Sequence, residues 1–331
     1  MKKVIIINFF IITAIIFILE IIIRALNIVE LQGYNKKAFF QENKIILSKA
    51  DKTFIVSGKK VKTDKNGFRI PLKDFTFEEG NNSYLILGDS VTYGVGIEEK
   101  FTFIGILRKK FNNKNFLNTA IFGHNLKSYS YLLKKNHQLF ENKIDKVIIF
   151  LCLNDIVPYQ GVVFNNKIQK TKKNKSFVEN YLKNNMTFEL NVFLRERSAI
   201  FVLLKSLFTK PVKRHYHYMY KLYEDNNNLI ESESHIKEIK KYSKENNINL
   251  EFVLLPYAHQ VMNNCEEKFL KPQNEMIKIF AKHDLIIKDY TQKFCSIFNK
   301  NELFLPYDPV HLSKYGHRNV SDLLIADKIF N

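Results

Sequence analysis

The sequence predicts an α/β domain with a parallel sheet, preceded by a membrane helix. From Ser83 onward, short apolar runs alternate with amphipathic helical segments, which is the pattern of β-α-β units. The run Val147 to Leu153 is apolar throughout, as expected of a central strand covered on both faces. A third observation, the almost wholly apolar stretch from Val4 to Ile23, predicts the membrane helix.

The composition excludes several other classes of protein. The 331 residues are 46% hydrophobic and 14% aromatic, which is enough for a packed core and excludes a wholly disordered chain. The scattered residues Cys152, Cys265 and Cys295 are too few for a disulfide framework and leave room for one disulfide. The net charge of +18 comes from lysines spread along the whole chain, so we expect no nucleic-acid partner.

The N-terminal segment decides the compartment. Val4 to Ile23 contains only three polar residues, among them Glu20 near its outer end, and about 20 apolar residues suffice to span a bilayer. Lys2 and Lys3 favour a cytoplasmic N-terminus. Cleavage as a signal peptide is the alternative, but no small-residue processing site follows the apolar run. We therefore expect a single-pass anchor over residues 1–25 and an extracytoplasmic domain, in the periplasm or at the cell surface.

The remaining chain divides into a lead-in and a catalytic domain. Residues 26–82 are expected to form a juxtamembrane lead-in segment with short strands such as Thr53 to Ser57, and residues 83–331 the α/β domain. The alternation of strands and helices is interrupted at about 157–228, and we interpret this stretch as a helical insertion. The expected elements are, in order, strand Tyr84 to Leu87, helix Phe101 to Phe111, strand Phe116 to Thr119, helix Ser128 to Leu139, strand Lys146 to Leu153, helix Ile230 to Asn246, strand Leu250 to Leu255, helix Lys268 to Lys282, strand Leu285 to Asp289 and helix Ser313 to Ile329. Within the insertion, the sequence including Val192 to Leu207 is typical of helix.

A serine follows the first strand of the domain. The sequence G-D-S-V-T-Y-G-V-G occupies positions 88 to 96, so Ser90 lies where a parallel strand gives way to a helix. Reactive groups of open α/β sheets gather at that edge. Thr92 replaces the second glycine of the G-x-S-x-G elbow, and the dinucleotide fingerprint is incomplete. Gly-Asp-Ser alone is also ordinary turn chemistry, and we expect Asp89 to brace the turn.

Three further segments carry residue types that suit nucleophilic catalysis. The sequence D-P-V-H, Asp308 to His311, precedes the last helix, and a carboxylate near a histidine can orient it as a base. A surface histidine at a helix entry is the alternative for this tetrapeptide alone. Gly123 and Asn154 follow the second and third strands, so they are expected at the same sheet edge as Ser90. A glycine N–H and an asparagine amide are the donors that hold an oxyanion.

These blocks resemble those of the SGNH (GDSL-type) hydrolase superfamily, in the family's order: G-D-S at Ser90, a glycine at Gly123, the third block at Asn154 and D-x-x-H at Asp308 to His311. Asn66-Gly67-Phe68-Arg69 resembles the lead-in of membrane-anchored bacterial members. The resemblance covers roughly residues 83–331. It implies a three-layer, flavodoxin-like fold, a Ser-His-Asp triad, and hydrolysis or transfer of acyl groups on oxygen esters.

Two positions depart from the family's pattern. Val91 replaces the leucine after the serine, which is a conservative exchange, and Cys152 replaces the glycine of the third block. The larger side chain at Cys152 bears on the direction in which Asn154 points. We expect Cys152 itself to be a buried small hydrophobe, because no neighbour in sequence would lower its pKa.

The two histidines of residues 214–218 and His317 fit structural roles better than metal binding. In R-H-Y-H-Y, residues 214–218, the two histidines are two positions apart, which suits opposite faces of a strand or loop. The basic and aromatic residues there could instead line a sugar-binding surface. His317, on the last helix, is expected to be structural.

The sequence therefore predicts a membrane-anchored serine esterase that removes O-acyl groups, O-acetyl first among them, from an extracytoplasmic polysaccharide. Ser90 would be the nucleophile, His311 the base and Asp308 its orienting carboxylate. The oxyanion hole would comprise Ser90, Gly123 and Asn154. We expect no cofactor and no metal; the partners are an O-acylated glycan or other ester and the membrane. The alternatives are an O-acyltransferase on the same polymers, a lipid or thioester hydrolase, and a non-catalytic envelope scaffold.

Overall fold

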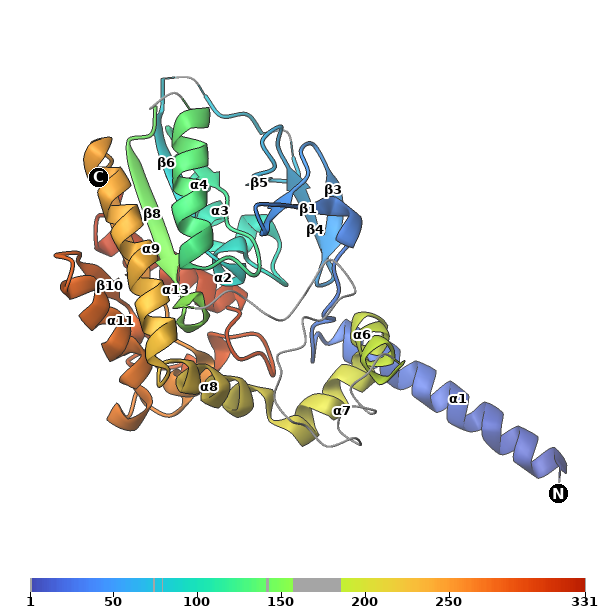
Figure 1. Cartoon of the computed structure of the whole chain (residues 1–331). Coiled ribbons are helices and arrows are strands. Elements are labelled where there is room, and N and C mark those ends of the chain that lie inside the picture. Colours follow the sequence, from blue (N-terminus) through green and yellow to red (C-terminus); the bar gives the residue numbers. More distant parts are fainter. Residues whose placement is uncertain (1, 74, 79, 141–142, 157–185, 331) are drawn as a thin grey trace.

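A parallel sheet forms the centre of the computed structural model, which describes residues 2–330 except 74, 79, 141–142 and 157–185. The spatial order of its five strands is β10-β9-β8-β6-β7, and all neighbours pair in parallel. In chain order this is the flavodoxin-like arrangement 2-1-3-4-5, so the predicted fold class is confirmed (Figure 1). The strands are β6 (Asn82–Leu87), β7 (Lys114–Asn118), β8 (Lys146–Leu151), β9 (Leu250–Leu254) and β10 (Ile287–Asp289).

Helices cover both faces of this sheet and make the outer two layers. In the view of Figure 1, α4 and α9 lie in front of the sheet and pack on each other, while α3 and α13 pack together behind it. A further helix, α11, packs against α9 and β10. The bounds are α3 (Phe103–Lys110), α4 (Leu126–Leu139), α9 (Asn226–Glu245), α11 (Lys271–Ala281) and α13 (Lys314–Ala326).

The central strand β8 is shorter than the sequence predicts. Its residues from Val147 to Leu151 are fully buried, as expected of a strand between two neighbours under helices on both faces. The predicted strand continues to Leu153, but the chain turns after Leu151 because the backbone N–H of Cys152 donates to Asp155 Oδ2 at 2.9 Å. This turn begins the short 3₁₀ helix Leu153–Ile156.

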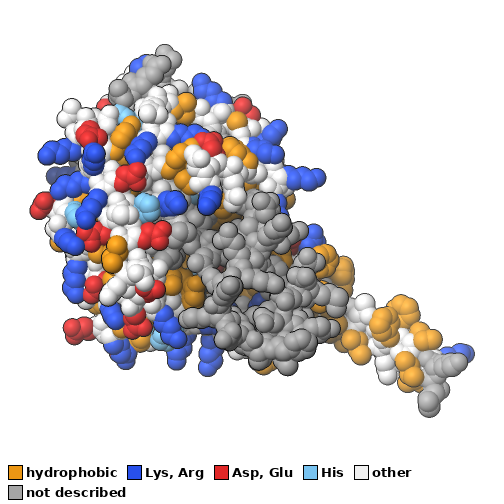
Figure 2. Space-filling model, viewed as in Figure 1, with side chains coloured by type: hydrophobic (Ala, Val, Ile, Leu, Met, Phe, Trp, Pro, Cys, Tyr) orange, Lys and Arg blue, Asp and Glu red, His pale blue; other side chains and the backbone are white. Residues whose placement is uncertain are grey.

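The N-terminal helix α1 (Lys2–Ala25) projects away from the sheet domain (Figure 1). Its segment Lys3–Ala25 has a mean hydropathy of 2.8 and buries none of its most apolar window. Within the described residues it is the one helix long and apolar enough to cross a membrane, and Figure 2 shows its hydrophobic side chains exposed along its length. The helix fits a single-pass anchor.

The lead-in segment forms two small antiparallel sheets. One pairs β1 (Phe39–Glu42) with β2 (Ile45–Ser48), and the other has the order β3-β4-β5. Phe39 and Phe54 from these sheets share a buried cluster with Tyr93 and Ile121, which follow β6 and β7. The lead-in therefore packs against the loops at the carboxyl end of the central sheet. The second sheet comprises β3 (Thr53–Val56), β4 (Lys59–Thr63) and β5 (Arg69–Ile70).

The described part of the predicted insertion is helical. Residues 157–185 lie outside the described residues; α6 (Met186–Arg197), α7 (Ala199–Thr209) and α8 (Pro211–Leu222) follow. The helical sequence around 192–207 divides into two helices at Ser198, which is in an extended conformation and whose Oγ caps α7 by accepting from Phe201 N at 3.2 Å. The R-H-Y-H-Y sequence lies in α8, not in a strand or loop.

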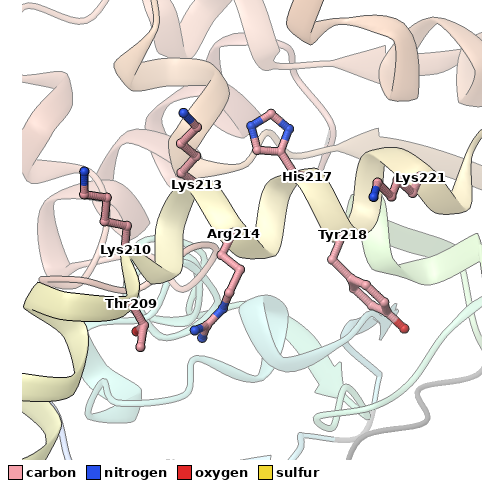
Figure 3. A pocket seen from close by; sticks show the side chains of 7 residues that line it. All are labelled: Thr209, Lys210, Lys213, Arg214, His217, Tyr218 and Lys221. Atoms are coloured by element: carbon pink, nitrogen blue, oxygen red, sulfur yellow. The ribbon is translucent and has the colours of Figure 1, made fainter. Parts of the chain in front are cut away.

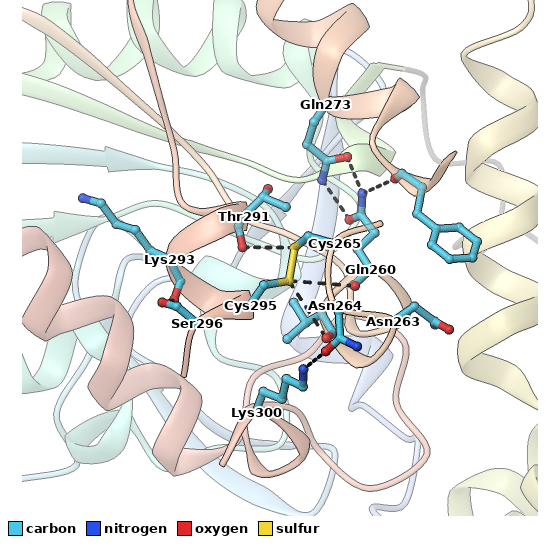
Figure 4. The surroundings of a disulfide bond; sticks show 12 residues. Gln260, Asn263, Asn264, Cys265, Gln273, Thr291, Lys293, Cys295, Ser296 and Lys300 are labelled. Carbon is cyan, nitrogen blue, oxygen red and sulfur yellow. Dashed lines mark hydrogen bonds between the residues drawn. A yellow bond between two sulfur atoms is a disulfide. The ribbon is translucent and has the colours of Figure 1, made fainter. Parts of the chain in front are cut away.

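One disulfide links two short helical segments at the carboxyl end of the chain. Cys265 follows α10 (Ala258–Met262), Cys295 ends α12 (Thr291–Cys295), and their Cα atoms are 6.1 Å apart. Figure 4 shows the bond beside Gln260 and Gln273, whose amides form a mutual pair, with Gln273 Nε2 donating to Gln260 Oε1 at 2.8 Å. Cys152 is free and buried, as the sequence predicts.

Candidate active site

Ser90 lies at the carboxyl end of β6, where the strand turns directly into a short helix. Gly88 and Asp89 connect β6 to α2 (Ser90–Tyr93), and Asp89 Oδ1 caps this helix by accepting from Val91 N at 2.9 Å. Asp89 thus braces the turn, as expected. A Cβ atom on Gly88 would lie 2.3 Å from Thr92 Oγ1, so the tight turn requires glycine.

Ser90, His311 and Asp308 form a continuous chain of hydrogen bonds. His311 Nε2 lies 2.9 Å from Ser90 Oγ, and His311 Nδ1 lies 2.8 Å from Asp308 Oδ2. The other carboxylate oxygen of Asp308 accepts from the backbone N–H groups of Val310 at 2.9 Å and of His311 at 2.7 Å. Asp308 therefore fixes both the ring of His311 and the loop that carries it.

Backbone contacts hold the D-P-V-H loop over the sheet edge. Ala258 N, just beyond β9, donates to the Pro309 carbonyl at 3.0 Å, and Leu305 N donates to the His311 carbonyl at 2.9 Å. Ser313 then caps α13, with its Oγ accepting from Gly316 N at 3.1 Å. The loop is thus tied to the carboxyl end of the sheet, on which Ser90 also lies.

The electrostatics of Asp308 and His311 suit a neutral histidine that accepts a proton. Burial lowers the pKa of His311, but the Asp308 carboxylate raises it more, so the pKa lies above its ordinary value. Burial raises the pKa of Asp308, but the charge and hydrogen bonds of His311 and the N–H of Val310 outweigh this effect and leave the pKa below its ordinary value. Asp308 is therefore ionised, and His311 is a stronger base than a free imidazole.

The side chain of Asn154 is held between two buried carboxyl groups. Its Nδ2 donates to Asp89 Oδ2 at 3.0 Å and to Asp155 Oδ1 at 3.3 Å, and its Oδ1 accepts from the Tyr257 hydroxyl at 2.6 Å. Burial raises the pKa of both Asp89 and Asp155. Both amide hydrogens thus have an acceptor within the protein, of which Asp155 is the more distant.

Asn154 nonetheless lies in the immediate surroundings of Ser90. Asp89 Oδ2, which accepts from the Asn154 amide, is 3.5 Å from Ser90 Oγ. Cys152 is buried, and its side chain leaves Asn154 on the Ser90 side of the sheet edge. The exchange of glycine for Cys152 therefore does not separate Asn154 from the serine.

Gly123 lies on the loop after β7, with a positive φ of 81° that favours glycine. Within the described part of the chain, the backbone N–H groups of Gly123 and Ser90 have no hydrogen-bond acceptor. The next residue, His124, ties the loop to the lead-in through its Nε2–H, which donates to the Ile46 carbonyl at 2.7 Å. The lead-in therefore contributes to the position of Gly123.

Sequence reasoning missed two residues near the site, Tyr257 and His215. Tyr257 is fully buried just after β9, and its hydroxyl donates to Asn154. The ring of His215, on α8, stacks on Tyr257 with the centroids 5.6 Å apart. Tyr257 follows a predicted strand, so its place at the same sheet edge as Ser90 could have been predicted from the sequence. His215 was assigned only to a histidine pair.

Arg69 supports the loop after the serine from a distance in sequence. The residue is fully buried, and its guanidinium donates to the carbonyl oxygens of Gly94 at 2.9 Å, Ile97 at 2.5 Å and Tyr93. The sequence Asn66 to Arg69 indicated only a lead-in. Its arginine is a clamp on the loop that follows α2.

His317 lies apart from the hydrogen-bonded chain of Ser90. It is fully buried, its Nδ1 accepts from Phe103 N at 3.3 Å, and burial lowers its pKa to about 3. It is therefore a neutral core histidine. Across the ranges that the structure describes, no cluster of three or more His, Cys, Asp or Glu residues could hold a metal ion.

No family model and no curated protein matches the chain. Solved structures similar to it include an acetyl xylan esterase, with 13% identity, a TM-score of 0.43, and coverage of 74% of this chain and 99% of the other. A lipase/acylhydrolase from Enterococcus faecalis has 14% identity, coverage of 74% and 94%, and a TM-score of 0.40. A lipolytic protein of the G-D-S-L family from Veillonella parvula has 14% identity, coverage of 75% and 99%, and a TM-score of 0.40.

Proposed function

We propose that the protein is a serine hydrolase of oxygen esters whose catalytic triad is Ser90, His311 and Asp308. The observation that carries this proposal is the hydrogen-bonded chain from Ser90 Oγ through His311 to Asp308, with distances of 2.9 and 2.8 Å. The raised pKa of His311 and the lowered pKa of Asp308 support it, because a base and its ionised orienting group need those directions.

In this mechanism His311 Nε2 accepts the proton of Ser90 Oγ as that oxygen attacks the ester carbonyl. The C–O bond to the alcohol then breaks, and the alcohol leaves with the proton from His311. An acyl-serine remains. Water repeats the sequence: His311 takes its proton, the hydroxide attacks the acyl carbon, and the carboxylic acid leaves as Ser90 regains the proton.

The oxyanion of the tetrahedral intermediate would accept hydrogen bonds from Ser90 N–H, Gly123 N–H and the Asn154 amide. Each such donor contributes roughly 3 kcal/mol to lowering the barrier. The Asn154 hydrogen directed at Asp155 Oδ1, the more distant acceptor at 3.3 Å, would be shared with the oxyanion, while the other hydrogen keeps its bond to Asp89 at 3.0 Å.

For the substrate, we propose O-acyl groups, O-acetyl first among them, on an extracytoplasmic polysaccharide. The anchor would be residues 1–25, the lead-in 26–82, and the catalytic domain 83–331 with its insertion at about 157–228. Lys2 and Lys3 before the apolar helix favour a cytoplasmic N-terminus. The Cys265–Cys295 disulfide also supports an extracytoplasmic domain, because disulfides persist in oxidising compartments.

The test uses the full chain in detergent and the variant Ser90→Ala, with Ser234→Ala on the exposed side of α9 as the matched control. We expect Ser90→Ala to abolish hydrolysis of p-nitrophenyl acetate while unfolding at the wild-type temperature, and Ser234→Ala to retain full activity. Acetate release from an acetylated glycan, compared with hydrolysis of longer acyl chains, tests the substrate class. Full activity of a folded Ser90→Ala would refute the triad, and transfer of acetyl to an added glycan would replace hydrolysis by acyl transfer.

A further inference from the structure

The anchor helix holds the first turn of α7. Glu20, on α1, accepts from Ala199 N at 2.8 Å and from Ile200 N at 3.0 Å, and thus satisfies two N–H groups of the helix terminus. Arg24 pairs with Glu20 at 2.6 Å and donates to the Arg197 carbonyl. The first turn of α7 is therefore held beside Glu20 and Arg24, near the carboxyl end of α1 (Figure 1).

This position along the axis of α1 corresponds to the surface of a bilayer that α1 would span. At 1.5 Å per residue, Glu20 lies about 8 Å before the end of α1 at Ala25. The interfacial layer on each side of the hydrocarbon core is about 5 to 8 Å thick. If α1 spans the membrane up to Ala25, the first turn of α7 lies within this layer.

The surface of α7 is apolar on two sides. Ala199 and Val202 pack in a buried cluster with Ile23 at the end of the anchor. On the outside, Leu204 and Leu207 are half exposed, and Phe208 is 83% exposed. Such a surface suits contact with acyl chains better than contact with water.

Cations follow directly after this apolar helix. Figure 3 shows Lys210, Lys213, Arg214 and Lys221 around a hollow on α8, together with His217 and Tyr218. An apolar helix that ends in a cluster of lysines and arginines has the pattern of an interfacial element on anionic lipid. The charge of this cluster is complementary to phospholipid phosphate groups.

We propose that α7 is a second membrane contact, lying in the interface of the bilayer that α1 spans. Leu204, Leu207 and Phe208 insert at the acyl-chain boundary, and the cations at the start of α8 contact anionic phospholipid headgroups. This inference rests on the proposed membrane anchor and not on the proposed catalysis. It fixes the catalytic domain to the membrane at two points, so that the active site keeps one distance from the bilayer.

The chain contains no tryptophan, so a single introduced tryptophan reports its own depth. The variants are Phe208→Trp, Phe17→Trp within α1, and Ile286→Trp as a control. Ile286 is 85% exposed, like Phe208, but precedes β10 at the amino edge of the sheet, away from Ser90. Each full-length variant is reconstituted into vesicles of phosphatidylcholine and phosphatidylglycerol with lipids brominated on the acyl chains, which quench nearby tryptophan.

We expect strong quenching of Phe208→Trp and Phe17→Trp, and none of Ile286→Trp. Quenching of Phe17→Trp without Phe208→Trp would overturn the second contact and leave the anchor intact. An unquenched Phe17→Trp would overturn the anchor and this inference together. Removing phosphatidylglycerol should at least halve the quenching of Phe208→Trp; an unchanged value would overturn the role of the α8 cations.

Discussion

At the scale of single residues, the pair His311 and Asp308 predicts a pH dependence. Only neutral His311 can accept the proton of Ser90, and Asp308 raises the pKa of His311 above its ordinary value of 6.5. The kcat/KM should therefore be constant at high pH and fall as the pH decreases through a value above 6.5. The measurement is the pH–rate profile for p-nitrophenyl acetate.

The variant Asp308→Asn tests whether this decrease in kcat/KM at low pH, the acid limb of the profile, reflects the protonation of His311. Loss of the carboxylate removes the effect that raises the pKa of His311, so the acid limb should move to lower pH. The kcat should fall by about 10⁴-fold, because the orientation and tautomer of the imidazole are no longer fixed. An acid limb at the wild-type position would assign the titration to another group.

Tyr257 is predicted to act through Asn154. In Tyr257→Phe the hydroxyl that donates to Asn154 Oδ1 is lost, and the amide is no longer held in one orientation. A hydrogen bond of about 1 kcal/mol corresponds to roughly a fivefold decrease in kcat, with KM unchanged. Tyr216→Phe is the matched control, since Tyr216 is equally buried and its hydroxyl donates to the Phe269 carbonyl instead. An equal loss of kcat in both variants would indicate a general packing effect.

The candidate site was predictable only in part, and the reason lies in the range of its contacts. Ser90, Asp308 and His311 stand in short motifs beside predicted elements, and the structure brings their side chains into one hydrogen-bonded chain. The hydrogen bond from the Asn154 amide to Asp89 was not predictable, because Asp89 comes from a different strand end. The position of a residue after a predicted strand indicates the sheet edge on which its side chain lies. It does not indicate which side chain will be its hydrogen-bond partner.

At the scale of elements, the strands of the central sheet were predicted because their apolar runs are local signals, whereas the boundaries of the helices within the insertion were not. The sequence of residues 192–207 contains no proline or glycine, so no local signal marks the boundary between α6 and α7. The chain breaks at Ser198 because Glu20, far away in sequence, also accepts from the first N–H groups of α7. Likewise, Arg69 binds carbonyl oxygens that follow α2, and no sequence pattern specifies that contact.

The disulfide gives a prediction for the segment between α10 and α12. Cys265 and Cys295 are separated by 30 residues, so the bond restricts the unfolded chain. Replacing both with alanine should lower the free energy of unfolding by about 3 to 4 kcal/mol, measured by denaturant unfolding of the full chain in detergent. A reducing agent should destabilise the wild type to the same extent and leave the double variant unchanged. Equal stability of wild type and variant under oxidising conditions would contradict the expectation.

At the scale of the whole molecule, the chain between the proposed anchor and the proposed triad is short. Extended chain from Ala25 to Glu30 can cover at most about 18 Å. Glu30 in turn lies near Asp308, because the charge of Asp308 raises the pKa of Glu30. Burial also raises this pKa, and Lys59 lowers it. With α1 in the membrane and the domain outside the cytoplasm, as proposed, the site would reach substrates at the membrane surface more readily than substrates in bulk solution.

The orientation of this assembly across the membrane is the final prediction. Lys2 and Lys3 should hold the N-terminus in the cytoplasm, so alkaline phosphatase fused after Asn331 should be active and green fluorescent protein dark. The same cells provide an independent measurement, because Cys265 and Cys295 should resist alkylation until a reductant is added. The reverse result in both measurements would put the domain in the cytoplasm, where these thiols stay reduced. Envelope glycans would then be out of reach, and a lipid or thioester would become the better substrate.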